Sequence, residues 1–214
     1  EEYNNPSMER VTAGMENLEK HIENCMHFGI TPVVALNHFP TDSEEELQYV
    51  IDRCALKGVK AVVARGFSQG GDGMRDLARE VVEVLESGRN AFAPLYDWNS
   101  PVKEKIEKIA KTIYGADAVH YTKEAESDLK TIEKLGLAAM PVCMAKTQKS
   151  FSDDERKIGR PKGFTVTVRE FEFAVGAGFI IPILGEMMRM PGLPATPASE
   201  GMDIDANGVI SGLS

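Results

Sequence analysis

The sequence predicts an α/β fold with a mostly parallel sheet, flanking helices and a smaller, β-rich α+β lobe at the C-terminal end. Over most of the chain, short β-branched runs alternate with amphipathic helical patterns, which implies right-handed βαβ crossovers and hence parallel strands. The pattern then changes: residues 147–162 are polar and charged, and residues 164–173 alternate with period two. We therefore expect a Rossmann-like α/β domain over residues 1–146 and a small lobe over residues 147–214.

The first unit of this alternation is well marked. Apolar residues at helical spacing between residues 11 and 26 predict a helix, with Gly29 as its C-terminal cap. The uncharged run 31–36 predicts a strand buried on both faces. A capping box at residues 43–46 opens the next helix, and the run 59–64 predicts a second strand. Together these elements predict two neighbouring parallel strands.

The alternation continues along the chain. A glycine-rich loop at 65–73 leads into a helix whose apolar residues between 74 and 85 are expected to face the core. Pro101 is expected at the first position of a third helix. The remaining expected elements are a strand at 118–121, a helix at 122–135 and a strand at 140–145.

Composition excludes several classes of function. The chain has 24 Lys and Arg against 33 Asp and Glu, a net charge of −9, so phosphate neutralisation and nucleic-acid binding are disfavoured. The most apolar stretch, 173–188, is too short and interrupted to span a bilayer. Cys25, Cys54 and Cys143 lie far apart, as free thiols in a reducing compartment do, and Cys143 is expected in the core. We expect a cytoplasmic protein without a membrane or nucleic-acid partner.

The loops after the first two strands are the candidate ligand site, because open parallel sheets bind ligands beyond the carboxyl ends of their strands. Phe39 lies in the loop 37–42 and Phe67 in the loop 65–73. Two aromatic side chains from neighbouring loops could hold a flat ring between them. A single Phe in such a loop is also typical of a plug over the core, and a glycine-rich turn is also typical of tight backbone geometry. The residues alone predict a ligand crevice between these two loops.

Charged residues offer weaker alternatives. His38 with Asp42 could form an acid–base pair, although a lone loop histidine is more often solvated or a capping residue. Lys146 and Lys149, with the acidic pair 153–154, could contact a charged ligand, although charge runs are usually solvated. Neither pattern selects a reaction.

Other chemistry has no signature in this sequence. There is no GxxxxGK[ST] loop, and the glycines at 66–73 do not match GxGxxG in order. His21 and His27 are six residues apart on a helix, which does not place them on one face for a metal. No Ser/His/Asp or Cys/His arrangement has a recognisable spacing. We therefore expect no metal site and no catalytic residue.

Several long runs carry more specific information. They are Asn37–Asp42, Leu95–Asp97 with Ile113–Asp117, Pro141–Gln148, Gly159–Arg169, Gly176–Phe179 and Met190–Pro194. Taken together, these runs resemble formate–tetrahydrofolate ligase (formyltetrahydrofolate synthetase). The resemblance extends from about residue 8 to the end of the sequence.

The resemblance implies an ATP-dependent ligase that makes 10-formyltetrahydrofolate from formate, ATP and tetrahydrofolate through a formyl phosphate intermediate. In the family the pterin ring of the folate lies between two aromatic residues, whose positions match Phe39 and Phe67. Pro40 and Val63 match positions that line the same pocket. Bacterial members usually have Trp where this sequence has Phe67, so weaker or altered folate binding is expected.

Length separates this sequence from its family, whose members are well over twice as long. Their nucleotide segment lies in an N-terminal domain, whereas this sequence opens on Glu1 near the start of the second domain. We therefore expect the C-terminal part of a homo-oligomeric ligase, inactive by itself, with the N-terminal domain and tetrahydrofolate as partners. ATP and Mg²⁺ would serve the intact enzyme and not bind this chain alone, and a monovalent cation is a further candidate.

Two alternatives stay open at this point. The chain could be a stand-alone, non-catalytic binding or assembly module derived from the family, because domains are reused for other roles. The crevice could also take another flat ligand, such as a nucleotide base.

Overall fold

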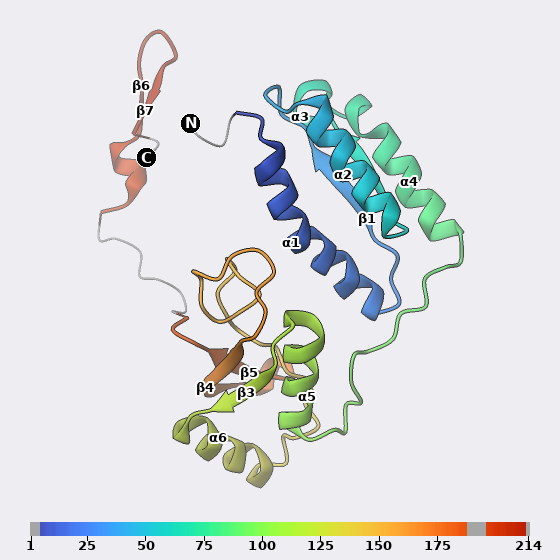
Figure 1. The fold of residues 1–214 in the computed structure, drawn as a ribbon. Helices are drawn as coiled ribbons and strands as arrows, with labels where there is room; N and C mark the ends of the chain where they lie inside the picture. Colours follow the sequence, from blue (N-terminus) through green and yellow to red (C-terminus); the bar gives the residue numbers. More distant parts are fainter. Residues whose placement is uncertain (1–4, 188–195, 213–214) are drawn as a thin grey trace.

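The computed structural model describes residues 5–187 and 196–212 (Figure 1). The α/β class is confirmed, because helices and strands alternate along most of the chain. The helices are α1 (Met8–His27), α2 (Glu44–Leu56), α3 (Gly66–Gln69), η2 (Asp72–Met74), α4 (Arg75–Glu86), α5 (Val102–Ile109), η3 (Ala110–Tyr114), α6 (Lys123–Lys134), η4 (Val175–Ala177) and η5 (Ala198–Gly201). The strands are β1 (Val33–Asn37), β2 (Lys60–Ala64), β3 (Ala118–Tyr121), β4 (Thr165–Ala174), β5 (Phe179–Leu184), β6 (Asp203–Ile204) and β7 (Ile210–Ser211).

The described strands form three small sheets, and β1 and β3 of the predicted α/β domain lie in different ones instead of in one mostly parallel sheet. In the first, β1 and β2 are parallel, as predicted, with Val33 opposite Lys60 and Asn37 opposite Ala64. Helices α1 and α2 cover one face, where Ile22 packs with other apolar residues of this unit. Helix α4 contacts both strands, and Lys60 of β2 donates a hydrogen bond to Glu80 of this helix.

The expectation that β1 is buried on both faces is wrong. Ala35 and Asn37 are exposed, whereas Val34 and Leu36 are half-buried. Alternate residues of a strand point to opposite faces, and the α1–α2 side covers only the face that carries Val34. A two-stranded sheet with one well-covered face leaves the other partly open.

The apolar stripe expected on α4 is also partly wrong. Val81, Val82 and Leu85 are exposed, the last with 68% of its surface accessible. The buried residues of this helix are Glu80 and Val84, one turn apart. Nζ of Lys60 donates to Oε2 of Glu80 at 2.8 Å. This ion pair with β2 helps to determine which face of α4 turns toward the sheet.

The second sheet holds the larger core. Strand β3 pairs in parallel with β4, and β4 pairs antiparallel with β5 through the short η4 connection. Adjacent strands joined by so short a link can only run antiparallel. This pairing crosses the boundary predicted at residue 146, and residues from both sides of it share one hydrophobic cluster. The division into two domains stays a prediction.

The segment 140–145 lies beside β5 but forms only isolated bridges instead of the expected strand. The N–H of Cys143 donates to the Ile180 carbonyl at 2.8 Å, and the N–H of Ala145 donates to the Pro182 carbonyl at 2.9 Å. Pro182 has no N–H to return, which breaks the ladder. Cys143 is exposed, so its assignment to the core is wrong.

Helix α1 lies between the two larger sheets (Figure 1). Its Lys20 and Asn24 side chains donate to the carbonyls of Thr112 and Ile113 at 2.6 and 3.0 Å. Asn17 donates to the Gly159 carbonyl at 3.0 Å. This one helix therefore joins the β1–β2 unit to the second sheet.

Two further expectations concern the first residues of helices and a possible membrane span. Pro101 is the N-cap of α5 rather than its first helical residue, and Thr122 is the N-cap of α6. Within residues 5–187 and 196–212, every helix is too short or too polar to cross a membrane. The run Met190–Pro194 lies outside the described residues.

Candidate functional site

The carboxyl ends of β1 and β2 bring the two predicted loops together. The N–H of His38 donates to the Ala64 carbonyl at 3.0 Å, which continues the β1–β2 pairing into the first loop. Phe39 follows directly and is 51% exposed, and Phe67 of the second loop is 82% exposed. Two large aromatic surfaces therefore stand open at the same end of one sheet.

A tight turn holds the backbone of Phe39. Its N–H donates to Oδ2 of Asp42 at 2.8 Å, and the N–H of Asp42 donates to the Phe39 carbonyl at 3.0 Å. Ser43 and Glu46 then form the predicted capping box of α2. The sequence 39–46 thus specifies a turn that leads straight into a capped helix.

The proposed acid–base pair of His38 with Asp42 has little support in this geometry. Asp42 uses its carboxylate to hold the turn, and no hydrogen bond between the two side chains is present in the described structure. Nδ1 of His38 is buried without a hydrogen-bond partner. The observed role of Asp42 is to fix the loop backbone.

The glycines of the second loop allow close contacts within the loop itself. The N–H of Arg65 donates to the Gly73 carbonyl at 3.0 Å, which closes the loop around α3. A Cβ at Gly73 would collide with the Arg65 carbonyl, and one at Gly66 would lie 2.8 Å from the Met74 sulfur. These contacts favour the tight-geometry interpretation of Gly66 and Gly73. Phe67 is carried outward on the four-residue α3.

The other two predicted site residues lie on the same β1–β2 unit. Pro40 is exposed next to Phe39. Val63 is half-buried in β2, directly opposite Leu36 of β1. The four predicted folate residues therefore lie near one end of the sheet, three of them exposed and one in its strand.

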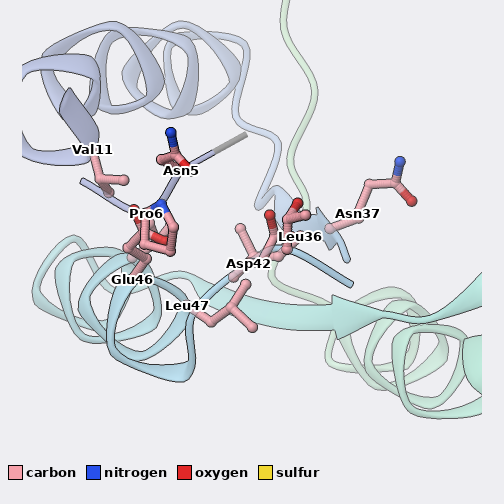
Figure 2. A pocket seen from close by; sticks show the side chains of 11 residues that line it. Asn5, Pro6, Val11, Leu36, Asn37, Asp42, Glu46 and Leu47 are labelled. Atoms are coloured by element: carbon pink, nitrogen blue, oxygen red, sulfur yellow. The ribbon is translucent and has the colours of Figure 1, made fainter. Parts of the chain in front are cut away.

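A hollow of about 360 Å³ borders the first loop from the side of α1 and α2 (Figure 2). Leu36 and Asn37 from the end of β1, Glu46 and Leu47 of α2, and Pro6 of the N-terminal segment line it, and the Asn37 side chain points away from Glu46 and Leu47. That segment is held because the N–H of Ser7 donates to Oε1 of Glu46 at 2.5 Å. Sequence reasoning missed this hollow, and no local signal could have revealed it.

The charged run after residue 145 is satisfied within the protein. Nζ of Lys146 donates to the carbonyls of Thr147 and Ser150 and lies 5.0 Å from the centroid of the Tyr114 ring. Burial lowers the pKa of Lys146. Lys149 pairs with Glu155 at 2.9 Å.

Asp154 in the same run pairs with Arg156 at 2.9 Å. Hydrogen bonds from the Arg156 side chain and backbone lower the pKa of Asp154 to about 2. These pairs give the run a local structural role.

Side chains that could bind a metal ion are scattered over the described part of the chain. Residues 5–187 and 196–212 contain no group of three His, Cys, Asp or Glu side chains that could hold a metal ion. His21 instead lies against Phe151, with ring centroids 4.7 Å apart. The glycine turn at 66–73 is closed by the hydrogen bond from the Arg65 N–H to the Gly73 carbonyl.

Comparison with known protein families decides the family. The family model of formate–tetrahydrofolate ligase matches residues 1–214, the whole of this sequence. The chain belongs to the formate–tetrahydrofolate ligase family. This family assignment confirms the resemblance seen in the sequence runs. It places the chain in tetrahydrofolate one-carbon metabolism and implies an ATP-dependent ligase in the intact protein.

In this formate–tetrahydrofolate ligase chain, two independent observations meet at one place. The resemblance of the sequence runs predicts Phe39, Pro40, Val63 and Phe67 as folate-binding residues, and this remains a prediction. The loops that carry them are also the loops that parallel-strand geometry selects as a ligand site.

Proposed function

We propose that this chain supplies the tetrahydrofolate pocket of a formate–tetrahydrofolate ligase, which makes 10-formyltetrahydrofolate from formate, ATP and tetrahydrofolate. The observation that carries the proposal is the pair of exposed rings, Phe39 and Phe67, on adjacent loops at the carboxyl end of β1 and β2. The family match supports the same assignment.

In this proposal the pterin ring stacks between the two phenyl faces. Stacking needs two apolar faces with room between them, and both rings have most of their surface free. Pro40 and Val63 supply apolar surface at the edges of the ring. Asp42 acts by holding the backbone of Phe39, so the first face is already in place before folate arrives.

We place the activation of formate outside these residues. The sequence has no GxxxxGK[ST] loop, and the glycine turn at 66–73 is closed by its own backbone hydrogen bond. ATP would supply the energy for the intact enzyme through formyl phosphate. The residues of this chain would bind and orient the folate that receives the formyl group, and the chain alone would be inactive.

A titration of the chain with tetrahydrofolate tests the proposal, followed by calorimetry and by the fluorescence of Trp98, its one tryptophan. We expect saturable binding that Phe39→Ala weakens by about 1–3 kcal/mol, the usual value of base stacking on an aromatic side chain. Phe92→Ala is the matched control, because Phe92 is exposed but lies beside Phe28, which precedes β1 at the other end of the sheet.

The possible results of this titration distinguish the proposed folate pocket from its alternatives. Unchanged affinity in Phe39→Ala would show that the aromatic pair is not the clamp. Absence of binding to the chain alone would place part of the pocket on another domain. Purine binding that folate does not displace would assign the crevice to a different flat ligand.

We also propose that the exposed side of α4 is covered by a second copy of the chain in a homo-oligomer. Val81, Val82 and Leu85 place apolar surface side by side on this helix, and such patches are typical of protein contacts. Light scattering of Leu85→Glu tests this, because a charge at a covered position should lower the molar mass of the assembly.

A further inference from the structure

A second hollow, of about 460 Å³, lies between α1, η3 and the loop 159–163. It shares no residue with the loops that carry Phe39 and Phe67. Four cationic side chains line it, against one carboxylate, that of Glu23. The cations are Lys20, Lys111, Arg160 and Lys162. Such a concentration of positive charge is unexpected in a chain with a net charge of −9.

Arg160 is already neutralised. Its Nη1 and Nη2 donate to Oε1 and Oε2 of Glu23 at 3.1 and 2.7 Å, so the guanidinium is bound by a carboxylate in the two-point manner. Burial alone would raise the pKa of Glu23, but hydrogen bonds from Arg160 and Lys57 outweigh it and lower the pKa. This ion pair forms a fixed wall with little charge to offer a ligand.

Lys20 is different, because it is buried without an ion pair. Only 5% of its surface is exposed, and the one hydrogen bond the structure gives its ammonium runs to the Thr112 carbonyl at 2.6 Å. Among the described residues, no carboxylate forms an ion pair with Lys20. Burial, and then the charge of Arg160, lower its pKa. A buried ammonium with donors to spare is costly unless an acceptor completes it.

The other two lysines add charge from separate elements. Lys111 of η3 and Lys162 of the loop reach Glu107 and Glu16 only at 3.4 Å, and all four side chains are largely exposed. Such exposed pairs are weak and exchange readily with other anions. Three ammonium groups can therefore turn to a ligand in the hollow without breaking a strong ion pair.

We propose that this hollow binds the phosphate group of a small molecule. Ammonium groups act as point charges and suit a tetrahedral oxyanion. The planar guanidinium of Arg160, which would best suit a carboxylate, is already bound to Glu23. Gly115 brings the backbone close to the buried lysine, since a Cβ there would be in van der Waals contact with Cε of Lys20 at 3.9 Å. The volume is within the range of small-molecule pockets.

Calorimetric titration of the chain with inorganic pyrophosphate at constant ionic strength tests the site. We expect saturable binding that Lys20→Met weakens about tenfold or more, the factor for losing one charge-assisted hydrogen bond. Lys20 is buried, so its substitution could unfold the chain. Lys111→Gln and Lys162→Gln therefore test the site at exposed positions, and each is expected to weaken binding several-fold. Lys130→Gln on the distant α6 is the matched control and should change nothing.

Three results would overturn the proposal: no saturable binding of pyrophosphate, equal weakening by Lys130→Gln, or equal affinity for succinate at the same ionic strength. The first excludes an anion site, the second reduces it to general surface charge, and the third excludes a preference for phosphate. Phe39→Ala is expected to leave pyrophosphate binding unchanged, so this outcome is independent of the folate proposal.

Discussion

Asp42 and Phe39 hold each other through two hydrogen bonds that run in opposite directions. The Phe39 N–H donates to the Asp42 carboxylate at 2.8 Å, and the Asp42 N–H donates to the Phe39 carbonyl at 3.0 Å. The turn they close carries an aromatic ring that is half exposed. An aromatic residue on a fixed backbone loses less entropy when it stacks on a ligand than one on a free loop.

Replacement of Asp42 tests this positioning role. Asp42→Ala removes the acceptor for the Phe39 N–H and should weaken folate binding by about 1 kcal/mol, the net value of one hydrogen bond. Asp42→Asn keeps an acceptor oxygen at the same place and should restore most of the affinity. If Asn and Ala lose the same affinity in calorimetry, the carboxylate acts through its charge and not through the turn.

Phe67 offers a gain-of-affinity test. Phe67 is 82% exposed on α3, so a larger ring can be accommodated there without repacking the core. Phe67→Trp adds stacking area and an indole N–H, and we expect tetrahydrofolate to bind several-fold more tightly. Phe67→Leu, which keeps apolar volume but not the flat face, should bind more weakly than either. Equal affinity of all three variants would remove Phe67 from the pocket.

Glu19 predicts a pH dependence of stability. It accepts a hydrogen bond from Arg53 and lies 3.2 Å from Lys57, both on the α1–α2 side of the first sheet. Burial alone would raise its pKa, but these two cations outweigh burial and lower the pKa below the ordinary 4.5. The stabilisation is therefore complete above pH 4.5 and is lost as pH falls through the lowered pKa.

Urea denaturation of Glu19→Gln at neutral and at acid pH measures this effect. We expect a loss of about 1–3 kcal/mol at neutral pH and a much smaller difference once Glu19 is protonated in both states. Glu133→Gln, at an exposed position of α6, is the control and should change little at either pH. A loss independent of pH would assign the role of Glu19 to packing.

Gly29 connects α1 to the segment that follows α4. Its φ is +69°, and a Cβ there would collide with the Ala91 carbonyl. The N–H of Ala91 donates to the Gly29 carbonyl at 2.9 Å. Gly58 has a similar φ of +75° but open space around it. Gly58→Ala should cost about 1–2 kcal/mol of stability from backbone strain alone, and Gly29→Ala should cost clearly more. Thermal denaturation of the two variants compares them directly, and equal losses would exclude the collision.

Elements with strong local signals could be predicted from the sequence. The capping box at 43–46, the helix ended by Gly29 and the strands β1 and β2 are present, because caps and periodicity act within a few residues. The two loops with Phe39 and Phe67 follow from the same elements. Their position at one end of a parallel pair needed no long-range information.

Features that depend on distant contacts could not be predicted. The face of α4 that turns inward is set partly by the pairing of Glu80 with Lys60, which overrides the apolar stripe. Pro182 on β5 interrupts pairing with a segment about forty residues earlier. The cationic hollow joins Glu23 to Arg160 across 137 positions of the chain, a contact with no signature in the sequence.

Helix α1 packs Ile22 into the core of the first sheet and uses Lys20 and Asn24 to bind carbonyls of η3 beside the second. Neither group of strands can open without exposing part of this helix. The two sheets are therefore expected to unfold as one cooperative unit, with a single transition and not two. Partial opening would have to begin elsewhere, in segments such as the β6–β7 hairpin that lie far from α1 (Figure 1).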